Sequence, residues 1–178
     1  IYIYDVEGKY LRTFAPKGDL GGKWAPLGLA FAPNGSLYVT DVRGLDFKTH
    51  RIVAFGPDGT VVRSMGAPGQ LNFPNGVVVD AQGNIEVSDS NNGRLVVFSP
   101  YGKMLAEISP VVGEGDLGLP RGAAVDGAGR LFVAYTPEPQ VPLSLPTNPE
   151  ERATFTRAFR AEGPAAGRVG SPDAWDTA

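Results

Sequence analysis

The chain has 178 residues, no cysteine and a formal net charge of −3, with its acidic and basic residues interspersed. The lack of cysteine excludes disulfides, thiolate metal sites and cysteine nucleophiles, and the charge pattern lacks the basic face typical of nucleic-acid binding. The 24 glycines and 16 prolines suit a turn-rich all-β protein, and no apolar run approaches the roughly 18 residues of a membrane span.

The chain begins inside a strand-like run without methionine, which favours a processed or incomplete chain. Tyr4 and Gly8 have the spacing of two later pairs, Phe55–Gly59 and Phe98–Gly102. Because those later pairs follow the third strand of a repeat, residues 1–15 are predicted to be a third and a fourth strand whose first two are missing.

Three copies of one pattern follow, beginning at Pro26, Pro74 and Pro120. The middle copy reads Pro74-Asn75-Gly76-Val77-Val78-Val79-Asp80, then Gly83-Asn84 and Val87-Ser88-Asp89. The copies are 48 and 46 residues apart. A fixed period of this length, built from short strands and glycine turns, is the sequence sign of a β-propeller.

Each full copy is divided by its turns into four strands. The first full copy predicts strands at about 28–31, 36–41, 51–55 and 60–64, and the second at 76–80, 84–89, 94–99 and 103–109. Residues 122–135 predict a further first and second strand with no clear third or fourth.

Residues 137–178 are predicted to form a separate, irregular tail. Five prolines lie between positions 137 and 149, which favours extended polyproline-like structure over sheet. Asn148 and Pro149 have the order of a helix N-cap and first turn, so a short helix over about 149–161 is expected. Phe155 and Phe159 lie one turn apart on it and make an apolar stripe suited to docking on a partner.

These motifs resemble the NHL-repeat β-propeller family. The shared pattern is Pro-x-Gly-Val-x-Val-Asp, Gly-Asn-Ile, Val-x-Asp-Ser and Asn-x-Arg-Leu-x-Val-Phe, which is close to complete in residues 74–103 and partial over roughly 1–136. The third copy departs from it with Tyr135 where the others have an aspartate, and the first has Ala32 at another aspartate position. The resemblance implies an all-β propeller segment over residues 1–136, and it is more specific to a fold than to a function.

Two full blades and two half-blades amount to three blades, which is fewer than the four to eight of a closed ring. Three interpretations follow. The chain is part of a longer, six-bladed protein, which we favour; or it is an open segment docked on a larger assembly; or two copies close head to tail, each filling the other's gap.

No catalytic residue, metal site or cofactor is predicted. His50 is the sole histidine and is expected to be a solvated loop residue, because a single imidazole cannot make a propeller metal site or a catalytic triad. Aspartates end the first and second strands of the copies: Asp41, Asp80, Asp89 and Asp126. Those that end a first strand are expected to cap the following turn. Those that end a second strand are expected to bond the next loop or the arginine that begins the third strand.

Two regions are candidates for binding. The loop Val42–His50 is five residues longer than its counterpart Ser90–Gly93, and extra loop length on a rigid scaffold is where specificity often lies. Asn75 and Arg121 occupy equivalent positions near one mouth of the predicted channel. The candidate binding residues are therefore Arg43, Asp46, Phe47, Lys48, Asn75, Arg121 and, in the tail, Phe155 and Phe159.

The function expected from these features is non-enzymatic: a protein–protein interaction or structural scaffold module. Its partners would be another protein, further blades of the same propeller or a second copy, with no nucleic acid and no membrane span. The composition, rich in Ala, Gly, Arg and Pro, favours a bacterial source, and the resemblance implies an extracytoplasmic setting, periplasmic or secreted. Two alternatives stay open. One is a metal-dependent propeller lyase or lactonase-like hydrolase whose ligands lie mostly in other blades. The other is an RNA-binding NHL domain, which the charge pattern disfavours.

Overall fold

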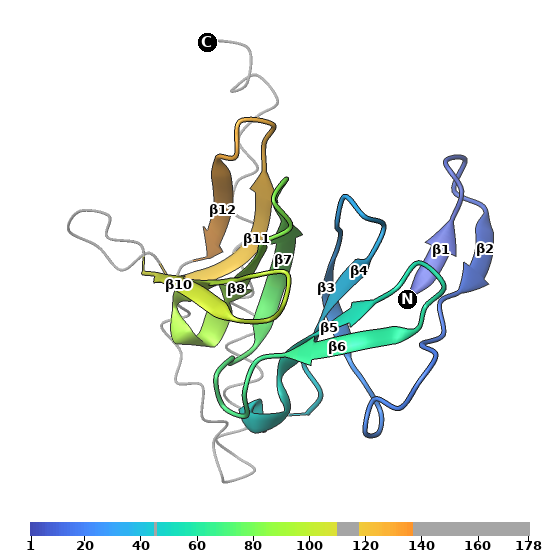
Figure 1. Ribbon diagram of the computed structural model, residues 1–178, viewed down its shortest axis with the longest axis horizontal. Helices are drawn as coiled ribbons and strands as arrows, with labels where there is room; N and C mark the ends of the chain where they lie inside the picture. Colours follow the sequence, from blue (N-terminus) through green and yellow to red (C-terminus); the bar gives the residue numbers. More distant parts are fainter. Residues whose placement is uncertain (45, 110–117, 137–178) are drawn as a thin grey trace, which may run out of the picture. The chain divides into compact units, whose positions relative to one another are not determined.

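The computed structural model describes residues 1–44, 46–109 and 118–136. Their strands form four antiparallel sheets, and the helices among them are two short 3-10 turns (Figure 1). No helix in this described part is long and apolar enough to cross a membrane. The tail, its expected helix and the Phe155–Phe159 stripe lie outside the described residues, so these stay predictions.

The first full blade contains four strands hydrogen-bonded side by side in chain order. They are β3 (Pro26–Phe31), β4 (Leu37–Asp41), β5 (Arg51–Phe55) and β6 (Val61–Met65), with the short helix η1 (Phe47–Thr49) between β4 and β5. This confirms the predicted strands, although the innermost strand begins two residues earlier than expected, at the proline.

The second full blade repeats this arrangement. It contains β7 (Pro74–Val79), β8 (Ile85–Asp89), the helix η2 (Ser90–Asn92), β9 (Arg94–Phe98) and β10 (Met104–Ile108). The inner strands β3 and β7 are in contact, so the two full blades pack face to face.

Two half-blades complete the described part, as the sequence predicts. β1 (Tyr2–Tyr4) pairs only with β2 (Tyr10–Thr13), which matches the third and fourth strands of a blade. β11 (Leu119–Val125) pairs only with β12 (Leu131–Thr136), which matches the first and second strands, and β11 contacts β7 of the second full blade. We call these pairs the N-terminal and the C-terminal half-blade.

The turns after the inner strands are held by the aspartates that the sequence singles out. Asp80 Oδ1 accepts the backbone N–H of Asn84 at 2.7 Å, and Asp126 Oδ1 accepts that of Arg130 at 2.9 Å. Gly83 takes φ +83° in the first of these turns, a region that a side chain rarely adopts. The prediction that these carboxylates cap turns is confirmed.

The core lies between blades. One cluster of buried side chains joins the two full blades and includes Tyr38, Ile52, Val77, Ile85 and Phe98. β8 carries Ile85 and Val87 fully buried on this face, as the alternation of its sequence predicts. Burial of this kind contributes roughly 1.5–3 kcal/mol for each large side chain, so the packing between blades is a main source of stability of the fold.

A second cluster attaches the N-terminal half-blade to the first full blade. Leu37, Val39 and Phe55 are buried in it, and Phe14 and Trp24 pack against them. The ring of Phe14 meets that of Phe55 edge-on, with centroids 5.3 Å apart. An aromatic pair in this geometry adds about 0.5–1.5 kcal/mol beyond its buried area, so the half-blade is anchored by aromatic packing.

Glycine allows the inner strands of adjacent blades to approach closely. A Cβ atom on Gly28 would lie 2.4 Å from the carbonyl oxygen of Asn75, and one on Gly76 would lie 2.4 Å from that of Arg121. No Cβ atom fits at such a distance from a backbone atom. The Pro-x-Gly element of the repeat is therefore a packing requirement of the propeller.

We expect Gly76→Ala to lower the free energy of unfolding by about 1–3 kcal/mol, because one blade must move to admit the methyl group. Urea denaturation of both variants and the parent measures this. The control is Gly127→Ala, where a Cβ would meet nothing within 4 Å. Equal stability of the two variants would contradict the proposed reason for the motif.

Candidate functional site

One end of the blades carries all the candidate binding residues that the structure describes. Pro26 of β3 pairs with Asp41 of β4, and Pro74 of β7 with Asp89 of β8. The starts of the inner strands, the ends of the second strands and the loops that follow them therefore lie at the same end. We call it the loop face.

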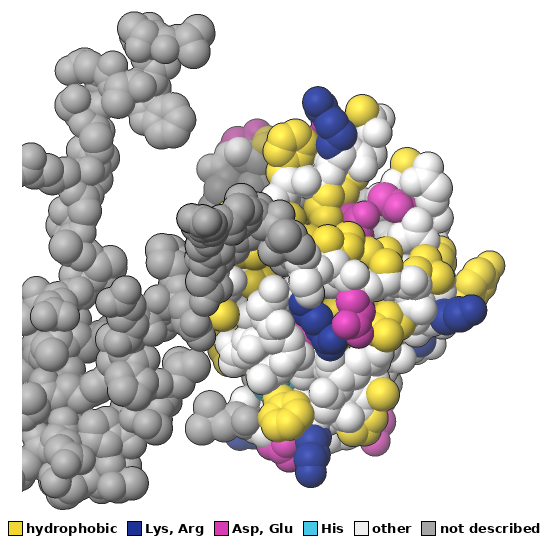
Figure 2. Space-filling model, turned by 90° about the vertical axis from the view of Figure 1, so that its left-hand side faces the viewer, with side chains coloured by type: hydrophobic (Ala, Val, Ile, Leu, Met, Phe, Trp, Pro, Cys, Tyr) yellow, Lys and Arg dark blue, Asp and Glu magenta, His cyan; other side chains and the backbone are white. Residues whose placement is uncertain are grey.

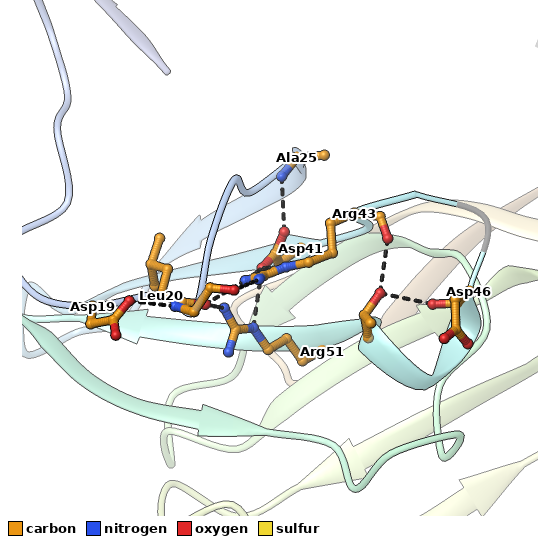
Figure 3. A network of polar contacts seen from close by, with 9 residues as sticks. Asp19, Leu20, Ala25, Asp41, Arg43, Asp46 and Arg51 are labelled. Atoms are coloured by element: carbon orange, nitrogen blue, oxygen red, sulfur yellow. Dashed lines mark hydrogen bonds and ion pairs between the residues drawn. The ribbon is translucent and has the colours of Figure 1, made fainter.

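A buried carboxylate organises the loop face of the first full blade (Figure 3). Asp41 is fully buried, and its Oδ1 accepts the backbone N–H of Ala25 at 2.9 Å. Its Oδ2 accepts hydrogen bonds from Arg43 Nη2 at 2.7 Å and Arg51 Nε at 3.1 Å. Both guanidinium groups also donate to the carbonyl oxygen of Leu20. The aspartate thus connects the second and third strands to the loop that leads into the inner strand.

The second full blade repeats the network. Asp89, also fully buried, accepts the backbone N–H of Asn72 at 2.6 Å and the Nε–H of Arg94 at 2.9 Å. Arg94 Nη2 then donates to the carbonyl oxygen of Gln70 at 2.7 Å. The prediction of a repeated structural network at these aspartates is confirmed. We call this arrangement the Asp–Arg clamp.

Asp89→Ala should lower the free energy of unfolding by about 2–4 kcal/mol, because the backbone N–H of Asn72 and the Nε–H of the largely buried Arg94 lose their acceptor, while Arg94 keeps only Glu107 and the carbonyl oxygen of Gln70. Thermal and urea unfolding measure the change. Glu7→Ala, at an exposed turn, serves as the control and should shift stability by less than about 0.5 kcal/mol. A loss at Asp89 no larger than the control would mean that the clamp contributes little.

The long loop Val42–His50 is held in place from both ends. Arg43, a predicted binding residue, donates hydrogen bonds to Asp41 and Leu20 in the clamp. The side chain of Asp46 caps η1 by accepting the backbone N–H of Lys48 at 3.0 Å, and Thr49 Oγ1 donates to the carbonyl oxygen of Arg43. Phe47 is 42% exposed. Phe47 and Lys48 are therefore exposed to solvent on the capped turn η1.

The expectation that His50 is a solvated loop residue is wrong. Its side chain is 2% exposed, and its Nδ1 accepts the backbone N–H of Phe73 at 3.0 Å. The Phe73 ring meets the imidazole edge-on, with centroids 5.9 Å apart. Phe73 has φ +55°, an unusual value for a bulky residue, and the bond from His50 helps to hold it. The histidine supports the entry into β7, a tertiary contact that local sequence does not reveal.

A groove runs along the starts of the three inner strands. It has a volume of about 360 Å³, and its walls include the equivalent residues Leu27, Asn75 and Arg121. In each blade the strand register shifts just after the proline, and such a bulge re-aims the local side chains. The structure thus places Asn75 in β7 and Arg121 in β11, on the wall of one groove. The sequence predicts equivalent positions near one mouth of the channel for these residues, but not a groove that they share. We call it the inner-strand groove.

The two polar side chains of this groove, Asn75 and Arg121, are each oriented by one hydrogen bond and have further polar atoms that can bind a ligand. Asn75 Nδ2 donates to Ser90 Oγ at 2.8 Å, and Arg121 Nε donates to Thr136 Oγ1 at 3.0 Å. Within the described residues, Asn75 Oδ1 and both Nη atoms of Arg121 have no hydrogen-bond partner. Ser90, which sequence reasoning missed, also donates to the carbonyl oxygen of Pro120 and so connects the two inner strands.

Two further polar groups lie on the opposite face of β8 from the main core. Ser88 Oγ and Glu86 Oε2 are buried without a partner in the described part of the chain. Burial, and to a smaller extent the nearby charge of Asp80, raises the pKa of the Glu86 carboxyl above its ordinary 4.5. Glu86 alternates with Val87 along the strand as a solvent-facing residue would, so alternation alone does not predict its burial.

A carboxyl with a raised pKa in the folded state destabilises the fold as the pH rises through that pKa. We therefore expect Glu86→Gln to raise the melting temperature at pH 7. The difference should shrink as the pH falls below the ordinary carboxyl value of 4.5, where the parent carboxyl is protonated in both states. Thermal unfolding from pH 3.5 to 8 measures it, with the exposed Glu7→Gln as control. A pH-independent difference would exclude this carboxyl as its cause.

The described residues include no group of three or more histidine or acidic side chains that could hold a metal ion. The carboxylates of the repeat are instead engaged with backbone N–H groups and arginines. On the face drawn in Figure 2, basic and acidic side chains lie interspersed among hydrophobic ones.

Comparison with known proteins defines the class of fold. A family model described as NHL repeat matches residues 71–98, which span β7, β8, η2 and β9. Structures that the chain resembles are β-propeller proteins. The sheets described above are therefore blades of an NHL-type β-propeller.

Three solved structures illustrate the likeness. A gluconolactonase from Xanthomonas campestris is 26% identical over 74% of this chain, with a TM-score of 0.52. A gluconolactonase-like protein is 22% identical over 72%, with a TM-score of 0.55. A catalytically inactive virginiamycin B lyase from Staphylococcus aureus, with quinupristin, is 12% identical over 68%, with a TM-score of 0.52. The chain spans 40%, 47% and 38% of these proteins, respectively.

Proposed function

We propose that this chain supplies part of the ligand-binding wall of a lactonase-type β-propeller. The inner-strand groove would bind an oxygen-rich sugar acid or its lactone. The observation that carries the proposal is the convergence of Asn75 and Arg121 on one groove. Each side chain is fixed through one nitrogen, and its other polar atoms have no partner within the described residues. The 26% identity with a gluconolactonase supports the choice of ligand class.

The chemistry of the groove suits such a ligand. The guanidinium group of Arg121 offers two N–H-bearing nitrogens to a carboxylate or a lactone carbonyl, and a charged hydrogen bond of this kind is stronger than a neutral one. The amide oxygen of Asn75 accepts a hydroxyl proton. Leu27 provides an apolar contact for the carbon skeleton. The described residues thus bind and orient a ligand, and we assign bond cleavage to groups outside them.

The test is isothermal titration calorimetry of the full chain with D-gluconate. We expect Arg121→Ala to weaken binding about tenfold or more, because a hydrogen bond to a charged group contributes about 1.5–3 kcal/mol. Asn75→Ala should weaken it about three- to tenfold. Lys103→Ala, exposed and away from the groove, is the matched control and should bind like the parent. Binding that neither groove variant alters would refute the assignment.

A second candidate function is the non-enzymatic interaction module that the sequence favours. The observation in its support is the turn η1, which Asp46 caps and which exposes Phe47 and Lys48. A capped turn loses little conformational entropy on binding, and an aromatic residue beside a charge is a common anchor at protein interfaces. A chain that neither binds gluconate nor releases acid from gluconolactone in a pH-stat assay would favour this second function.

A further inference from the structure

A hollow on the loop face of the first full blade is lined by basic side chains. It has a volume of about 330 Å³, and its walls include Arg43, Lys48 and Arg51. None of the described acidic residues is part of its wall. It shares no residue with the inner-strand groove, so it is a separate site. We call it the basic pocket.

Both arginines of the pocket are held side by side by the clamp, as Figure 3 shows. The Nε and Nη2 of Arg43 bond to Asp41 Oδ2 at 3.2 and 2.7 Å, and the Nε of Arg51 bonds to the same oxygen at 3.1 Å. Arg51 Nη1 and Lys48 Nζ, in contrast, have no partner within the described residues. Three cationic side chains and one carboxylate leave a surplus of two positive charges.

Other titratable side chains of these loops do not remove this surplus. Asp19 Oδ1 accepts the backbone N–H of Gly21 at 2.6 Å, and Asp46 Oδ1 accepts that of Lys48 at 3.0 Å. Neither aspartate lines the pocket. His50 does line it, but its Nδ1 accepts a backbone N–H. That nitrogen therefore carries no proton, and the imidazole adds no charge.

The second full blade neutralises the corresponding arginine. Arg94 is the first residue of β9, as Arg51 is the first residue of β5. Arg94 Nη1 bonds to Glu107 Oε2 of β10 at 2.8 Å. A further hydrogen bond to the clamp aspartate comes there from the neutral amide of Asn92, whereas the first full blade uses the cationic Arg43. The second full blade thus pairs one arginine with two carboxylates.

Ser64 stands in the first full blade where the second has this extra carboxylate. On the fourth strand, Glu107 pairs with the residue two positions after Arg94, and Ser64 pairs with the residue two positions after Arg51. Ser64 lines the basic pocket, and its Oγ has no hydrogen-bond partner in the part of the chain that the structure describes. The same framework therefore carries an excess of negative charge in one blade and of positive charge in the other.

We propose that the basic pocket binds a phosphate group, either as the free ion or as part of a small phosphate monoester. A phosphate monoester carries about −1.5 to −2 charges at pH 7, which matches the surplus. Arginine and lysine donate charge-assisted hydrogen bonds to phosphate oxygens, and the hydroxyl of Ser64 can donate another. A carboxylate brings a single negative charge and would leave one cation uncompensated.

This site goes beyond the proposed function and does not rest on it. The inner-strand groove and the basic pocket have different walls, so their ligands can be titrated separately. Gluconate binding should respond to Arg121→Ala, and phosphate binding should respond to changes at Ser64. Either proposal can therefore fail while the other holds.

The test is isothermal titration calorimetry of the full chain with inorganic phosphate, at neutral pH and constant ionic strength. Ser64→Glu should weaken binding at least about tenfold, because the new carboxylate pairs with Arg51 and repels the ligand. Lys48→Ala should weaken it about threefold or more, because a charged donor is lost. Gln82→Glu is the matched control and should bind like the parent, since it adds the same charge in an exposed turn at the opposite end of the blades.

Glycerol phosphate, titrated in the same way, separates the two sources of the phosphate group. Tighter binding of this ester assigns the pocket to a small phosphorylated molecule, and tighter binding of inorganic phosphate assigns it to the free ion; both results support the proposal. Circular dichroism without phosphate checks that every variant folds. A parent chain that binds neither ligand, acetate that binds as tightly as phosphate, or a Ser64→Glu variant that binds like the parent would each overturn the proposal.

Discussion

The rest of the described structure depends on the Asp–Arg clamp at the end of each full blade. One buried carboxylate accepts a backbone N–H from the loop that enters the inner strand and a guanidinium hydrogen bond from the start of the third strand. The same guanidinium also binds a carbonyl oxygen of that loop. Because a buried charge is costly unless it is paired, the aspartate and the arginine fix the path of the loop together. Each inner strand therefore starts at a defined place, and the inner-strand groove lies between these starts.

The second constraint is the distance between adjacent blades. Carbonyl oxygens of one inner strand approach the glycines of the preceding one so closely that no side chain fits between them. The residue just before each glycine lies at a bulge, with its side chain on the groove. A position that packing does not restrict is free to vary, and the three blades carry leucine, asparagine and arginine there. The ligand binding that we propose uses this variable position beside rigid packing.

Much of the fold follows from the sequence because the repeat is local. The strand limits, the half-blades, the turn-capping aspartates and the Asp–Arg pairs all follow from spacing and alternation within about 47 residues. The contacts at the candidate site are harder to predict from the local repeat. Arg43 looked like a free binding residue but is held by Asp41, and His50 looked solvated but is buried against Phe73. Both contacts depend on which loops come together at the end of a blade, and the periodic pattern of the sequence does not predict this.

The sequence by itself determined the class of fold, the order of the strands and the positions of the repeated aspartates and glycines, since each is fixed by backbone geometry that recurs in every copy. Only the tertiary structure decided which polar groups are paired within the described residues and which of them are buried without a partner there, as Glu86 Oε2 is. Asn75 and Arg121 share a groove because β7 and β11 pack together. Contacts between blades join residues more than 30 positions apart, so their chemistry depends on packing in three dimensions.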